Sequence, residues 1–199
     1  MKAFKFFSFF IVITLCFTNT QCEDDDFFPT QIDIINNTVV HIENNETTLN
    51  INESIIIETN ILNEQITSTG QNILLTDYDY AEAGQSGYYH TLTLYKLTSF
   101  GTIAEIPLTS DNITNIEGET LVENQTITAR SIFDGTSYKN KFSILLPESG
   151  IFYLAGSRFL TDNDGKLRMD GGIYEKALIT ISSTMVGANA NGAYAFTVN

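Results

Sequence analysis

The stretch Tyr88-Tyr89-His90-Thr91-Leu92-Thr93-Leu94-Tyr95-Lys96-Leu97-Thr98 decides the fold class, because its side chains alternate with a period of two. One expected face carries Tyr89, Thr91, Thr93 and Tyr95, and the other carries His90, Leu92, Leu94 and Lys96. Successive side chains of a β-strand point to opposite faces of its sheet. The alternation therefore predicts a strand over residues 88–98.

Strand patterns continue on both sides of this stretch, and β-branched residues predominate in them. A turn at 99–101 leads into a short strand and closes a hairpin. A second hairpin is expected where strands 141–146 and 151–159 join through Pro147-Glu148-Ser149-Gly150. Further strands are expected at 38–42, 48–51, 54–62, 103–106, 126–133, 177–184 and 193–198. Residues 63–87 and 109–123 are expected to be loops, and no helix is expected.

Roughly eight to ten short strands separated by turns are typical of a sandwich or a closed barrel. The segment Leu146-Pro147-Glu148-Ser149-Gly150-Ile151-Phe152-Tyr153-Leu154 resembles the E–F corner of immunoglobulin-like domains, with Phe152 where the corner has its aromatic residue. The resemblance implies an all-β protein, an immunoglobulin-like β-sandwich of roughly eight to ten antiparallel strands. A closed barrel is the alternative.

The N-terminus has the pattern of an export signal. Met1-Lys2-Ala3-Phe4-Lys5 is positively charged, the apolar run 6–17 follows, and Cys22 stands at the expected cleavage point. The apolar run is too short to cross a hydrocarbon layer of about 30 Å as a helix. Residues 1–21 are therefore predicted to be a signal peptide that plays no part in the fold.

Cys22 and the acidic cluster behind it resemble the N-terminus of surface-exposed lipoproteins of Bacteroidota. The cluster consists of Glu23, Asp24, Asp25 and Asp26. The resemblance implies that Cys22 carries a diglyceride and a palmitate, and that the cluster directs export to the outer face of the bacterial outer membrane. The expected organisation is a signal peptide over 1–21, a lipidated tether over 22–30 and one all-β domain over 31–199.

Charge and cysteine content exclude several classes of protein. The net charge is −14, and loss of Lys2 and Lys5 with the signal would make it −16. Such a chain is not expected to bind nucleic acid, because it cannot neutralise phosphates. Cys16 would leave with the signal, so Cys22 would have no cysteine partner for an internal disulfide. The expected attachment is to the outer membrane through the lipid, with an unidentified protein or glycan as partner.

The most conspicuous candidate contact loop joins carboxylates to tyrosines. It consists of Asp77, Tyr78, Asp79, Tyr80 and Glu82, followed by Tyr88 and Tyr89. Tyrosine gives a large contact area at low entropic cost, so the loop is a candidate recognition surface. Carboxylates on alternate residues of an extended segment would point the same way, as in a glycosidase pair. However, the chain contains no Trp, which is a favoured sugar platform. A simple solvated loop is the alternative.

Three other polar sets complete the candidates. Asp162, Asp164 and Asp170 present oxygen ligands that suit calcium, although an Asp-Gly hairpin turn is the simpler interpretation. His41 and His90 are too few for a structural zinc site without further cysteines. No serine has the Gly-x-Ser-x-Gly surroundings of a nucleophile elbow. No cofactor is expected beyond the lipid.

The sequence therefore predicts a cell-surface lipoprotein that acts as a non-catalytic binding or structural module. One alternative is an accessory glycan- or solute-binding protein of an outer-membrane uptake system. A second alternative is a hydrolase whose site the sequence does not disclose.

Overall fold

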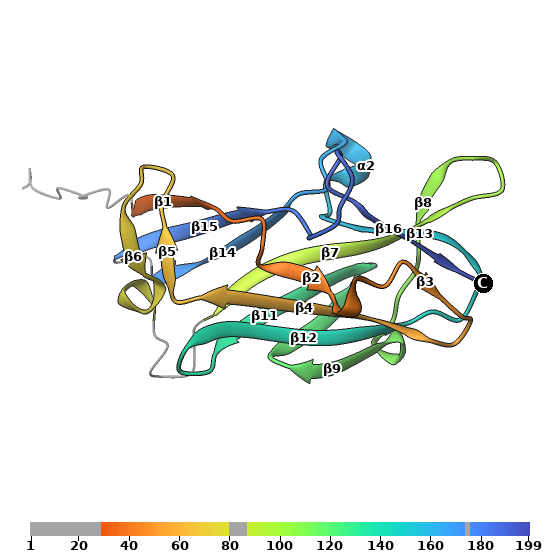
Figure 1. The fold of residues 1–199 in the computed structure, drawn as a ribbon, viewed down its shortest axis with the longest axis horizontal. Coiled ribbons are helices and arrows are strands. Elements are labelled where there is room, and N and C mark those ends of the chain that lie inside the picture. The colour runs from red at the N-terminus through yellow and green to blue at the C-terminus, as the bar shows by residue number, and fades with distance from the viewer. Residues whose placement is uncertain (1–28, 80–86, 174–175) are drawn as a thin grey trace, which may run out of the picture.

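Residues 29–79, 87–173 and 176–199 are described by a computed structural model, and they form an all-β, sandwich-like architecture (Figure 1). Fourteen strands join into one sheet that curls over itself. The predicted all-β sandwich class is confirmed. Among the described residues the helical elements are short, although none was expected: α2 (Phe159–Asp162) and the 3₁₀ turns η1 (Glu43–Asn45), η2 (Leu75–Tyr78) and η4 (Ser110–Asn112).

The curled sheet has two layers, which share the strand β11 (Thr126–Phe133). The first layer contains β1 (Thr30–Ile35), β15 (Ala177–Ser183), β14 (Leu167–Ile173), β7 (Tyr88–Leu97), β8 (Ile103–Glu105), β13 (Gly150–Ala155), β16 (Tyr194–Val198) and β3 (Thr48–Leu49). The second layer contains β12 (Ser137–Leu145), β4 (Ser54–Leu62), β2 (Val40–Ile42) and β9 (Ile113–Glu117). β10 (Glu119–Glu123) pairs with β11, and β5 (Glu64–Ile66) with β6 (Asn72–Leu74) forms a separate hairpin.

β11 links the layers because its two ends pair with different strands. Residues Thr126 to Ser131 pair with β7, and Ile132 and Phe133 pair with β12. Most pairs are antiparallel, as expected, but β1 lies parallel to β15 and β16 lies parallel to β3. The long pairing of β12 with β4 runs from Leu145 opposite Ser54 to Ser137 opposite Leu62.

The core forms where the inner faces of the two layers meet. Alternate residues of β4 are buried, namely Ile55, Ile57, Thr59 and Ile61. Ile56 points to the opposite face and is only half-buried. Phe152 stacks on Phe196 with ring centroids 5.6 Å apart. Each fully buried side chain of this size contributes about 1.5–3 kcal/mol through removal of apolar surface from water.

Several local predictions were wrong, and exposure explains the clearest of them. Residues 109–123 are not a loop, because they contain β9 and β10. Ile116 is 52% exposed and Leu121 is 65% exposed, so these strands lack the apolar alternation of a half-buried sheet. The expected loop 63–87 likewise contains β5, β6 and η2, and β1 begins before the first predicted strand.

The strands 141–146 and 151–159 do not form the predicted hairpin. β12 pairs with β4, β9 and β11, whereas β13 pairs with β16 and β7. The connection through Pro147 therefore carries the chain from one layer to the other, as an E–F corner does. The strand also ends at Ala155, and Gly156 begins the segment that leads to α2.

Candidate functional site

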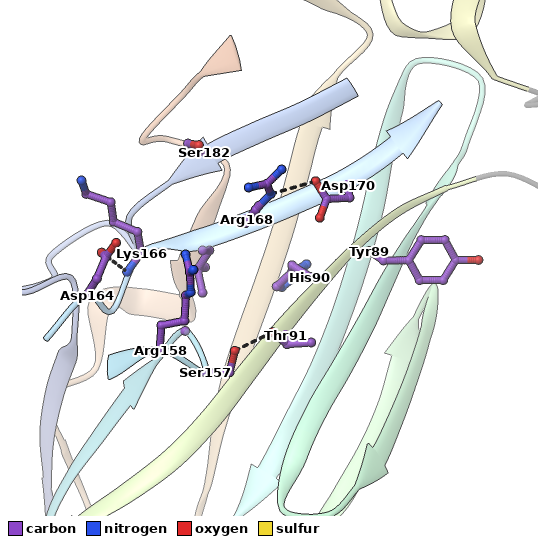
Figure 2. Close-up of a pocket in the computed structure, with 12 residues that line it drawn as sticks. Tyr89, His90, Thr91, Ser157, Arg158, Asp164, Lys166, Arg168, Asp170 and Ser182 are labelled. Carbon is purple, nitrogen blue, oxygen red and sulfur yellow. Dashed lines mark hydrogen bonds and ion pairs between the residues drawn. The ribbon is translucent and has the colours of Figure 1, made fainter. Parts of the chain in front are cut away.

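A hollow of about 450 Å³ lies where β7 and β14 diverge (Figure 2). β7 pairs with β13 up to Thr93 opposite Ala155, and it pairs with β14 at Tyr89 opposite Asp170. Residues 90–92 of β7 therefore lie between its two partner strands. The lining, which we call the β7–β14 hollow, consists of Tyr89, His90, Thr91, Gly156, Ser157, Arg158, Asp164, Lys166, Leu167, Arg168, Asp170 and Ser182.

One wall of the hollow is built from segments that are far apart in the sequence. The N–H of Gly156 donates to the carbonyl of Gly165 at 3.0 Å, and the N–H of Gly165 donates to the carbonyl of Asn191 at 2.7 Å. A Cβ atom on Gly156 would lie 2.2 Å from the carbonyl oxygen of Lys166. Glycine is thus required at 156 by a close backbone approach, and it keeps Ser157 and Arg158 beside the start of β14.

Three basic side chains, those of Arg158, Lys166 and Arg168, line the hollow. Arg168 donates from Nε to Asp170 Oδ1 at 3.1 Å and from Nη2 to Thr180 Oγ1 at 3.2 Å. The Nε atom of Arg158 lies 3.4 Å from a carboxylate oxygen of Asp162. Within the described parts of the chain, the Lys166 ammonium group has neither a hydrogen bond nor an ion pair.

The lining of the hollow is much less acidic than the chain as a whole. The sequence has 10 Lys and Arg residues against 24 Asp and Glu residues. The hollow has three basic side chains against the two carboxylates of Asp164 and Asp170. Both carboxylates are already engaged: Asp164 accepts from the N–H of Lys166 at 3.1 Å, and Asp170 accepts from Arg168 and from Thr180 Oγ1 at 2.7 Å. The lining therefore has one more basic than acidic side chain, and Asp162, which pairs with Arg158, offsets that excess.

His90 is the deepest polar residue of the lining, with 2% of its surface exposed. Figure 2 places its ring between β7 and β14. Neither Nδ1 nor Nε2 has a hydrogen-bond partner among the described residues. Burial lowers the pKa of His90 to about 4, so the imidazole is neutral at pH 7. A neutral imidazole has one donor and one acceptor, and both are buried without a partner here.

Two serines also line the hollow, and this bears on the hydrolase alternative. Ser157 accepts a hydrogen bond from Thr91 Oγ1 at 3.3 Å. A serine nucleophile needs a base within hydrogen-bond reach. Among the described residues, no hydrogen bond joins His90 to Ser157 or Ser182. The hollow thus brings histidine and serine together without a nucleophile–base contact.

The predicted contact loop is divided between surface and core. Asp77 is exposed and Tyr78 is half-buried in η2, so this part of the segment does not meet the condition of being extended. Asp79 is only 7% exposed, and it accepts a hydrogen bond from the hydroxyl of Tyr138. Tyr80 and Glu82 lie outside the described residues. Asp77 and Asp79 therefore do not form a surface pair.

The two tyrosines that follow this loop, Tyr88 and Tyr89, also lie in different environments. Tyr88 is buried and lies edge-on to Tyr138, with ring centroids 4.9 Å apart. Burial raises the pKa of both hydroxyls well above the usual range, and the nearby Asp79 carboxylate adds to this rise. Tyr89 is 45% exposed, and the Arg130 guanidinium lies 5.5 Å from its ring centroid. Of the two, Tyr89 reaches the surface, at the edge of the hollow.

The three aspartates of the calcium hypothesis have separate partners. Asp162 pairs with Arg158, Asp164 accepts from a backbone N–H, and Asp170 is held by Arg168 and Thr180. In residues 29–79, 87–173 and 176–199, no group of three or more His, Cys, Asp or Glu side chains is placed to hold a metal ion. The predicted ligands are therefore not assembled into one site.

Sequence reasoning missed the hollow, although one signal was present. Arg158, Lys166 and Arg168 fall within a short span of a chain that has few basic residues. Such clustering in an acidic protein is a reason to expect a site for an anion. The burial of His90 was not visible, because it depends on the pairing of β7 with three other strands.

The predicted lipidation site and export signal, Cys22 and residues 23–26, lie outside the described residues. Within the described part of the chain, no helix has the length and apolarity needed to span a bilayer. No protein-family model matches the sequence, and no curated protein matches it either.

Proposed function

We propose that this protein is an exported lipoprotein, anchored through Cys22 to the outer face of a bacterial outer membrane, and that it acts as a non-catalytic binding module. Its ligand site is the β7–β14 hollow. The observation that carries this assignment is the hollow itself, whose volume of about 450 Å³ is within the range of small-molecule sites. The sequence pattern at residues 1–26 supports export and anchoring.

The shape and lining of the hollow favour a small polar solute or a sugar unit over a flat protein partner. Sugars present many hydroxyl groups that both donate and accept hydrogen bonds. The hollow offers donors on Arg158, Lys166 and Arg168, and it offers groups of both kinds on Ser157 and His90. This is the accessory glycan- or solute-binding version of the module. Because Asp79 and Tyr88 are buried, the predicted contact loop is less suited to be the main binding surface.

A variant that fills the hollow tests this assignment. Ser157 is exposed on the wall, so Ser157→Trp should place an indole ring inside the hollow. Ser99→Trp, in the exposed turn between β7 and β8, is the matched control. The full chain is applied to an array of mono- and oligosaccharides. Binding should fall at least about tenfold in Ser157→Trp and stay unchanged in Ser99→Trp. Equal binding by both variants would place the ligand elsewhere.

A further inference from the structure

In the part of the chain that the structure describes, each basic residue outside the hollow contacts an acceptor of the chain itself. Their contacts are Lys96 with Glu148 at 2.9 Å, Arg130 with Glu119 at 2.9 Å, Lys139 with Asp134 at 2.7 Å, Lys141 with Glu43 at 2.6 Å, and Lys176 with the carbonyl of Asp77 at 2.6 Å. Among the described residues, Lys166 is the one basic side chain whose charged group has no such partner. The ammonium group of Lys166 therefore remains free to bind a ligand, although the chain as a whole is strongly acidic.

The two arginines of the hollow keep donors free as well. Arg168 uses Nε and Nη2 within the protein, so its other terminal nitrogen, Nη1, has no partner among the described residues. Arg158 contacts Asp162 through Nε at 3.4 Å, which is longer than a good charge-assisted hydrogen bond. Guanidinium groups bind planar oxyanions through paired N–H donors. Lys166 and the two arginines therefore form a basic rim that suits an anionic oxygen group.

His90 supplies a different kind of recognition below this rim. Its two ring nitrogens are buried and unpartnered, whereas nearly all buried polar groups in proteins are hydrogen-bonded. One nitrogen donates and the other accepts, which matches a hydroxyl group rather than a second anion. The charged residues that line the hollow together with His90 are Arg158, Asp164, Lys166, Arg168 and Asp170.

We infer that the β7–β14 hollow takes an acidic sugar, that is, a small ligand that carries a carboxylate or a sulfate together with hydroxyl groups. The anionic group lies at the rim formed by Arg158, Lys166 and Arg168, and a hydroxyl group lies near His90. The net negative charge of the chain does not oppose this, because charges farther than about 8 Å are largely screened at physiological salt. This inference rests on the proposed function, since it names the ligand class of the same site.

Calorimetric titration of the full chain in detergent tests the inference with three named probes. The probes are D-glucuronate, D-glucose 6-sulfate and D-glucose, which share a ring and differ in charge. We expect at least one of the two anions to bind ten times more tightly than glucose or better, and the ratio between them shows whether carboxylate or sulfate is preferred. Equal affinity for all three would overturn the anion inference while leaving the hollow as a sugar site. No binding of any probe at millimolar concentration would overturn the acidic-sugar inference, and the proposed function is then decided separately by the array with Ser157→Trp.

Single variants separate the rim from general charge effects. Lys166→Gln should reduce the preference for the anionic probe over glucose at least about fivefold, because it removes the free ammonium group. Lys139→Gln removes the same charge from an ion pair on β12 and should leave the preference unchanged. His90→Phe should weaken glucose and the anion alike, since it removes contacts to hydroxyl groups. An unchanged preference in Lys166→Gln would show that the rim does not hold the anion.

Discussion

Tyr138 donates its hydroxyl hydrogen bond to the buried carboxylate of Asp79, which lies 59 residues earlier in the chain. The contact connects β12 in the second layer to the segment that follows η2, and Tyr88 of β7 packs edge-on against the same tyrosine ring. Asp79, Tyr138 and Tyr88 thus bring together three segments that are separate in the sequence. Such buried contacts are costly to leave incomplete.

Tyr138→Phe should therefore destabilise the protein. The change removes the hydroxyl and retains the ring, so the loss is mainly that of a hydrogen bond to a charged group. We expect the free energy of unfolding in urea to fall by about 1.5–3 kcal/mol. Tyr153→Phe is the matched control, because the Tyr153 hydroxyl has no hydrogen-bond partner in the described regions and its ring contacts Phe159 in either form. Equal stability of the two variants would contradict this account.

His90→Phe should leave the protein folded and change how its stability depends on pH. In the folded state the pKa of His90 is about 4, and in the unfolded chain it is about 6.5. The unfolded state therefore binds more protons between these values, and stability falls as the pH drops from about 6.5 to about 4. At pH 4 this difference in pKa lowers the free energy of unfolding by about 3 kcal/mol.

Urea unfolding at pH 7, 5 and 4 measures this effect as a difference between the wild type and His90→Phe. The wild type should lose about 3 kcal/mol more than the variant over this range. At pH 7 the variant should be as stable as the wild type or more so, because an apolar ring replaces unpartnered polar atoms. Parallel pH profiles would show that His90 is protonated as easily in the folded chain as in the unfolded one.

The strands with one clearly buried face could be predicted from the sequence. β7 and β4 show the alternation in the sequence itself, because most of their inner residues are apolar and most of their outer residues are polar. β9 and β10 could not be found this way, since Ile116 and Leu121 are exposed although they lie in strands. Apolar and polar residues alternate in the sequence only where one face of a strand is buried. Strands with little burial therefore lack the pattern from which they could be predicted.

The site was harder to predict because it depends on which segments meet. The 156–158 segment, the start of β14 and the middle of β7 are separated in sequence, and hydrogen bonds at Gly156 and Gly165 bring the first two together. The contact loop was predicted from its composition alone, and composition does not show that Asp79 and Tyr88 pack inward. The burial of Tyr88 reflects its place on the inner face of β7 beside Tyr138.

Gly156→Ala should disturb the wall of the hollow. The added Cβ would lie 2.2 Å from the Lys166 carbonyl oxygen, so the backbone must move. We expect a loss of about 1–3 kcal/mol in unfolding free energy, as for other overpacked sites. The segment that carries Arg158 should also shift, and affinity for glucuronate should fall.

Gly70→Ala is the control for this variant, because a Cβ at Gly70 meets no atom within 4 Å. Gly70 has a φ of +83°, so alanine there costs about 1–2 kcal/mol from backbone strain alone. Affinity for glucuronate should be unaffected in Gly70→Ala. A Gly156→Ala protein with unchanged affinity would show that the close approach to Lys166 does not shape the hollow.

Cys22→Ala should release the protein from membranes. A chain with two or three acyl groups is held stably at a bilayer, whereas the polar β-sandwich has no comparable anchor in the proposed arrangement. Cells that express the wild type in the presence of radiolabelled palmitate should incorporate the label into the protein, and the variant should carry none. After cell fractionation, the wild type should sediment with outer membranes and the variant should remain in the soluble fraction. A matched Cys16→Ala variant should behave as the wild type, because Cys16 belongs to the expected signal peptide. If the Cys22→Ala protein stayed as firmly attached as the wild type, the proposed acyl anchor would be wrong. The protein would then be held at the membrane by something other than a lipid on Cys22.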